Sequence, residues 1–124
     1  MSKVEKDEER ENRIYDEAIV DAYGPEEQAI GWYYHLDEKL QFPFTARCIR
    51  ERGISPLRLD ETVRVTGMAD ADDCMVEMFV KIEWGGRSFG VPLAQLQGID
   101  VDGETEEAIA DWHYWVGRGY RLCG

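Results

Sequence analysis

The stretch that decides the fold is MFVKIEWGGRSFGVPL, at residues 78–93. Apolar side chains recur at every second position on both sides of Gly85-Gly86, which is the pattern of strands with one buried face. Two adjacent glycines can both adopt a positive φ, as a two-residue hairpin turn requires. The stretch therefore predicts an antiparallel hairpin, with strands at 78–84 and 89–93.

The period-two pattern continues upstream of the hairpin in shorter segments. Residues 44–48 follow Pro43 and alternate as a first strand. Residues 57–59 and 62–65 predict two short strands around a turn at Asp60-Glu61, and residues 94–96 predict a short turn. The chain is thus expected to form about five short antiparallel strands, a number compatible with a small SH3-like barrel.

Helical periodicity lies on either side of the strands. From Arg13, apolar residues at helical spacing predict a helix that Gly24 ends, and Pro25 starts a second helix that runs to about Lys39. A third helix is expected from about Thr105 to Gly117. Two N-terminal helices, the strands and a C-terminal helix define an α+β fold. Residues 1–12 are a charged lead-in that frays or forms an exposed helix, and residues 13–124 form one domain.

The charge of the chain limits its partners. Fourteen basic and 26 acidic side chains in 124 residues give a net charge of −12. Nucleic acids and anionic membranes attract basic surfaces, so neither is an expected direct partner. A cation, a basic protein or water suits such a surface better. No phosphate-binding glycine loop, GxSxG elbow or HExxH motif occurs in the sequence, so we expect no enzyme.

The acidic residues are grouped along the chain. Residues 1–27 carry a net charge of −6 and residues 67–77 a net charge of −4, whereas residues 42–66 are net positive. Residues 98–111 hold six acids and no base. Such grouping indicates a cation site, although solubility alone also explains acidic surfaces.

The first candidate metal site lies in residues 98–111. Calcium takes six to eight oxygen ligands, and an Asp-x-Asp-Gly turn followed by helical acids supplies carboxylates. The turn is not an EF-hand, because its glycine and its final acid stand at the wrong positions. The alternative is that these acids only complement the positive end of the helix dipole. The candidate ligands are Asp100, Asp102, Glu107 and Asp111.

A second candidate site lies on the N-terminal helical pair. One helical face there holds an acid at each end, with Ile30 and Tyr34 between them. The acids at Asp70, Asp72 and Asp73 are instead typical of a solvated hairpin tip. The candidate ligands of this second site are Asp21, Glu26, Asp37 and Glu38.

Several blocks of the sequence resemble the cyanobacterial calcium-binding protein family. Its members are small acidic calcium binders without an EF-hand, linked to heterocyst differentiation. The resemblance extends over roughly residues 12–120, and aromatic-rich runs make it specific. The blocks that carry it are Tyr15–Glu17, Val20–Glu27, Gly31–Tyr34, Leu40–Cys48, Val91–Leu93, Gly98–Asp102 and Asp111–Trp115.

The resemblance implies binding of Ca²⁺ by surface carboxylates, with a fold that becomes more compact around the ion. A role as an intracellular calcium buffer or sensor in calcium signalling follows from it. Residues 1–10 contain no apolar signal-peptide core, so a cytoplasmic location is expected. The alternative function is an acidic SH3-like interaction module that recruits a basic protein partner. An inhibitor that mimics DNA is a further alternative.

Overall fold

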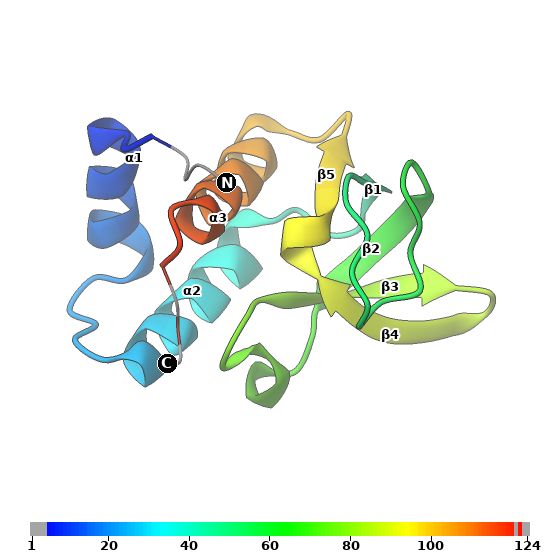
Figure 1. The fold of residues 1–124 in the computed structure, drawn as a ribbon, viewed down its shortest axis with the longest axis horizontal. Coiled ribbons are helices and arrows are strands. Elements are labelled where there is room, and N and C mark those ends of the chain that lie inside the picture. Colours follow the sequence, from blue (N-terminus) through cyan, green and yellow to red (C-terminus); the bar gives the residue numbers. More distant parts are fainter. Residues whose placement is uncertain (1–4, 121, 123–124) are drawn as a thin grey trace.

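The computed structural model describes residues 5–120 and residue 122. Three helices gather on one side of the molecule and a sheet forms the other side, so the α+β architecture is confirmed (Figure 1). No helix in the described residues is long and apolar enough to cross a membrane. The main elements are α1 (Glu8–Arg13), α2 (Pro25–Lys39), β1 (Phe44–Cys48), β2 (Thr62–Met68), β3 (Phe79–Trp84), β4 (Arg87–Pro92), β5 (Leu96–Ile99) and α3 (Gly103–Gly117).

The five strands form one antiparallel sheet in the order β4-β3-β2-β1-β5. A bulge between Val65 and Gly67 interrupts the pairing of β2 with β3. Among the described strands β4 and β5 are the two edges, so the sheet is open and does not close into an SH3-like barrel.

The predicted hairpin is confirmed. Gly85 and Gly86 have φ of 54° and 81°, and Trp84 pairs with Arg87 across them. Val80 and Ile82 of β3 and Val91 of β4 are fully buried. The alternation of the sequence thus sets which face of this hairpin enters the core.

Two of the predicted elements between the helices differ from the structure. Residues 57–59 form no strand, and of their two leucines Leu57 is buried whereas Leu59 is 56% exposed. The amide of Leu57 donates to the side chain of Ser55, and the amide of Leu59 donates to the side chain of Glu51. These local acceptors satisfy backbone donors that a neighbouring strand would otherwise take. The fifth strand is instead β5, whose first residue, Leu96, falls in the turn predicted at residues 94–96. Strand β5 pairs with β1, with Ile99 opposite Thr45.

The N-terminal helix begins earlier and ends earlier than predicted. Asp7 caps α1 by accepting a hydrogen bond from the amide of Arg10 at 3.0 Å. A π-helical turn, η1 (Ile14–Ala18), follows, and Ile19 donates to the carbonyl of Ile14. The helix does not reach Gly24, because the chain turns at Asp21, which has a φ of 56°. The lead-in therefore contains a helix from residue 8.

Helix α2 has the predicted bounds and packs on η1 and α3. Its buried side chains include Trp32, whose ring lies 5.1 Å from that of Trp112 and 5.8 Å from that of Trp115. The close approach of α2 to η1 occurs at Gly31, where an added Cβ would lie 2.6 Å from the carbonyl oxygen of Ala18. These contacts pack the middle of α2 against η1 and the second half of α3.

We expect Gly31→Ala to lower the free energy of unfolding by at least about 1 kcal/mol, because overpacking against backbone outweighs the roughly 1 kcal/mol that alanine contributes within a helix. Gly53→Ala is the control, since a Cβ there meets nothing within 4 Å. Urea unfolding followed by tryptophan fluorescence measures both. Equal stability of the two variants would contradict the tight approach of α2 to η1.

Candidate metal site

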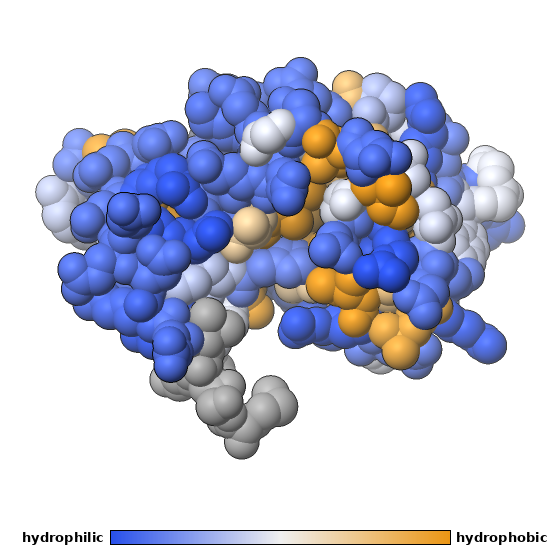
Figure 2. All heavy atoms as spheres, turned by 90° about the horizontal axis from the view of Figure 1, so that it is seen from above, coloured by the Kyte–Doolittle hydropathy of each residue, from blue (hydrophilic) through white to orange (hydrophobic). Residues whose placement is uncertain are grey.

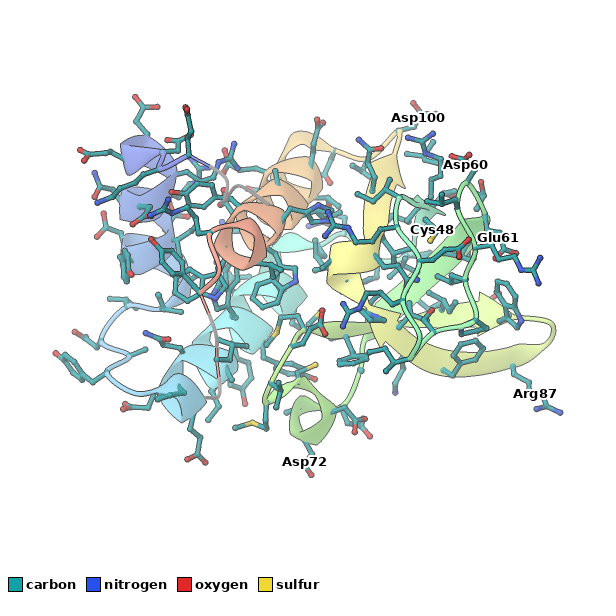
Figure 3. All side chains as sticks on the ribbon, in the orientation of Figure 1. Cys48, Asp60, Glu61, Asp72, Arg87 and Asp100 are labelled. Carbon is teal, nitrogen blue, oxygen red and sulfur yellow. The ribbon has the colours of Figure 1, made fainter. Side chains whose placement is uncertain are left out.

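The acidic turn between β5 and α3 contains Asp100 and Asp102. Asp100 has a φ of 52°, and Figure 3 shows its side chain beyond the tip of β5, directed out of the molecule. Asp102 is the N-cap of α3 and accepts a hydrogen bond from the amide of Thr105 at 3.3 Å. The Asp102 carboxylate therefore has a structural role, in addition to any role in binding.

Asp100 and Asp102 line one hollow of about 790 Å³. Gln41, from the chain after α2, and Thr45 of β1 line it as well. The amide of Gln41 donates to the hydroxyl of Thr105 at 2.9 Å, which fixes this segment against α3. The polar side chains that line the hollow present carboxylate, amide and hydroxyl oxygens, the donor type that Ca²⁺ prefers.

The other two candidate ligands of the first site lie elsewhere on α3. The Asp111 side chain is only 2% exposed, and its Oδ1 lies 2.7 Å from both Arg10 Nη1 and Arg13 Nη2. Arg13 Nε donates to Asp111 Oδ2 at 3.0 Å, and this hydrogen bonding raises the pKa of Arg13. Glu107 Oε1 lies 3.5 Å from the same Arg13 nitrogen. The structure thus joins Glu107 and Asp111 through Arg13, and neither of them lines the hollow.

The residues of the second candidate site are all exposed. Asp21 lies in the loop before α2, Glu26 in the first turn of α2, and Asp37 and Glu38 in its last turn. Asp37 lies eleven positions after Glu26, which corresponds to about 16 Å along a helix. The four carboxylates are therefore divided between the two ends of α2.

In the part of the chain that the structure describes, no three His, Cys, Asp or Glu side chains form a group that could hold a metal ion. A calcium ion in the hollow would then need backbone carbonyls, Gln41, Thr45 and water to complete its coordination. Sequence reasoning missed Gln41 and Thr45, because nothing near them in the sequence marks them as neighbours of residues 100–102. It also missed Arg10 and Arg13 as partners of Asp111.

His35 is buried and His113 is half-buried. Burial lowers the pKa of His35, and this effect outweighs the negative charges of Asp111 and Glu17, which raise it. Burial also lowers the pKa of His113, and this effect outweighs the backbone groups of Leu96 and Leu93, which raise it. Both imidazoles are therefore neutral in the folded protein at neutral pH, in agreement with a structural role.

The surface around these sites is strongly polar. Seen from above, the helical side is almost entirely hydrophilic, and apolar side chains reach the surface in patches nearer the strands (Figure 2). The oxygen-bearing side chains at the hollow and the many exposed carboxylates are features of proteins that bind hard cations such as Ca²⁺.

Comparison with known proteins gives the family. A family model described as calcium binding, that of CcbP, matches residues 12–116. The crystal structure of Anabaena CcbP is 45% identical with a TM-score of 0.85, and it aligns over 97% of this chain and 98% of its own. A structure of a calcium-binding protein in the calcium-binding form is 44% identical with a TM-score of 0.83 over the same shares. No curated protein matches. The chain belongs to the CcbP family of calcium-binding proteins, as the resemblance predicted.

We expect Asp111→Asn to lower the free energy of unfolding by about 2 kcal/mol, because two arginines lose a buried anionic partner. Asp7→Asn is the control. It removes an exposed partner of Arg10 at 3.7 Å but keeps the N-cap, so its cost stays below about 1 kcal/mol. Urea unfolding without calcium measures both. Similar small losses for the two variants would show that the buried pairs do not hold α1.

Stability should fall on acidification below about pH 6.5. The folded-state pKa of His35 and that of His113 lie below the unfolded value of 6.5, so the unfolded chain binds more protons in this range. The contribution of the two histidines to the free energy of unfolding is fully present above about pH 6.5. It is lost toward lower pH, by at most about 1.4 kcal/mol per pH unit for each histidine. The lowered pKa of Glu11 adds a further loss below its unfolded value of 4.5.

Urea midpoints in chelator between about pH 5 and pH 8 test this dependence. His35→Gln should reduce the slope near pH 6, whatever its effect on stability at pH 8. A flat profile for the wild type across this range would contradict the assignment.

Proposed function

We propose that the protein binds Ca²⁺ reversibly and acts as an intracellular calcium buffer or sensor in the cytoplasm. The observation that carries the proposal is membership of a calcium-binding family over residues 12–116. A relative of 44% identity, solved as a calcium-binding protein in the calcium-binding form, supports calcium as the ion. Binding rather than catalysis is the activity that this family membership supports.

The hollow at Asp100 and Asp102 is our first choice for the ion. It combines two carboxylates with the oxygens of Gln41 and Thr45, and the described residues place no Lys or Arg in its lining. Calcium prefers oxygen ligands and tolerates irregular geometry with bound water, although Pro43, Phe44, Ile99 and Val101 also line this hollow. Asp21, Glu26, Asp37 and Glu38 remain candidates for weaker sites on α2.

The location of the ion decides between buffer and sensor. An ion held by Asp100 and Asp102 leaves the contacts of α1 intact, as suits a buffer. An ion that takes Asp111 and Glu107 must displace Arg10 and Arg13, which would release α1 as in a sensor. The two cases differ in whether calcium changes the environment of α1.

Isothermal titration of the chelator-treated protein, at about 0.15 M salt, tests the proposal with Ca²⁺ and with Mg²⁺. Calcium should bind more tightly, because magnesium demands a stricter geometry and loses its water reluctantly. Asp100→Asn combined with Asp102→Asn should weaken calcium binding at least tenfold. Asn tolerates the positive φ at position 100 and caps a helix as well as Asp, so the fold is kept.

The matched control is Asp72→Asn combined with Asp73→Asn, which removes two exposed charges far along the chain from the hollow. Its isotherm should equal that of the wild type. Equal loss in both double variants would indicate only a general charge effect. No difference between Ca²⁺ and Mg²⁺ would overturn a specific calcium site.

A further inference from the structure

The segment from η1 to Glu38, one residue before α2 ends at Lys39, carries an unbalanced charge. Seven acids and no Lys or Arg occur between Ile14 and Glu38. All seven are exposed, and none forms an ion pair within the described part of the chain. The acids are Asp16, Glu17, Asp21, Glu26, Glu27, Asp37 and Glu38.

Four of these acids frame two exposed apolar side chains on α2. Ile30 is 45% exposed and Tyr34, one turn later, is 65% exposed. At about 100° per residue, both lie near the middle of an arc of about 120°, with acids on either side. We call this arc the outer face of α2: Glu26, Glu27, Ile30, Tyr34, Asp37 and Glu38.

The buried residues of α2 lie on the opposite arc. Ala29, Trp32, His35 and Leu36 face the core, and their mean direction is about 180° from that of the outer face. Ile30 and Tyr34 therefore lie on the side of α2 away from the core, although the ring of Tyr34 contacts that of Tyr33. Tyr23, just before the helix, is 86% exposed and adds a third apolar side chain near its start.

An apolar centre with a charged rim is the anatomy of a protein interface. The charge of the rim selects the occupant. A second copy of this chain would place four acids against four acids, and an anionic membrane or a nucleic acid would be repelled in the same way. A basic helix with one apolar side satisfies both the centre and the rim.

We propose that the outer face of α2 docks a basic amphipathic helix of a partner protein. Apolar side chains of the partner contact Ile30 and Tyr34, and its Lys or Arg side chains pair with the acids on both sides. This inference does not rest on the hollow at Asp100 and Asp102. Because Glu26, Asp37 and Glu38 are also candidate ligands of weaker calcium sites, the test is made without calcium.

The probe is a synthetic lysine–leucine peptide of about 18 residues with all its leucines on one helical side. The comparison peptide has the same composition with the leucines spread around the helix. Fluorescence anisotropy in EDTA, which excludes calcium, should show at least fivefold tighter binding of the amphipathic peptide. Higher salt should weaken this binding, because exposed charges contribute to it.

Ile30→Ser combined with Tyr34→Ser should weaken binding of the amphipathic peptide at least tenfold. The matched control is Ile54→Ser combined with Val76→Ser, two side chains of similar exposure outside this segment, which should leave the affinity unchanged. Asp37→Asn combined with Glu38→Gln should weaken binding and reduce its salt dependence. Asp72→Asn combined with Asp73→Asn should do neither.

Amide chemical-shift changes on peptide binding should concentrate in residues 23–39. Changes concentrated at residues 98–107 instead, or unchanged affinity of the Ile30/Tyr34 variant, would overturn the proposal. Equal binding of the two peptides would do the same, since it would reveal a merely electrostatic surface. So would a wild-type dimer that the Ile30/Tyr34 variant does not form. Failure here leaves the calcium titration unaffected, so the two proposals are tested separately.

Discussion

The pairing of the buried Asp111 carboxylate with Arg10 and Arg13 holds the helical half of the protein together. A carboxylate that is 2% exposed is costly unless it is paired and hydrogen-bonded, and its partners come from α1. Helix α1 has six residues and is too short to be stable alone. A second buried acid, Glu11, completes the attachment by accepting hydrogen bonds from Tyr114 at 2.8 Å and Tyr120 at 2.6 Å. The N-terminal segment is therefore fixed to α3 by charge and hydrogen bonding, although its sequence is nearly all charged.

Local signals in the sequence were sufficient where the structure depends on local geometry. Pro25 at the first turn and the following period placed α2 correctly, and Gly85-Gly86 placed the hairpin turn, since both motifs restrict the backbone directly. One failure comes from a contact between distant residues and the other from local side chains that compete for backbone amides. Residues 96–99 became a strand because β1 offered a free edge, and residues 57–59 did not, because nearby side chains took their amides. Only the first outcome lies beyond a window of ten residues, since Ile99 pairs with Thr45 whereas Leu59 bonds to Glu51.

The candidate metal site shows the same division. Periodicity correctly put Glu107 and Asp111 on one side of α3, where both contact Arg13. It does not reveal that this side faces α1, nor that Asp100 and Asp102 line a hollow with Gln41 and Thr45. An acid cluster in a sequence thus contains two kinds of carboxylate, those that stabilise the fold and those that remain available to a ligand. The ion pairs of Asp111 assign it to the first kind in this structure.

The two exposed acidic surfaces also differ in the ligand they suit. A calcium ion needs six to eight oxygens directed at one point, which a concave surface provides and a convex one does not. The hollow at Asp100 is concave and brings oxygen-bearing side chains together among apolar ones, whereas the acids on α2 diverge from a helix. Those acids lie beside Ile30 and Tyr34, which offer an ion nothing beyond the tyrosine hydroxyl. Those two side chains lose exposed apolar area only when another apolar surface covers them. Shape therefore favours the first surface for an ion and the second for the basic helix that we propose, even though the net charge of both is negative.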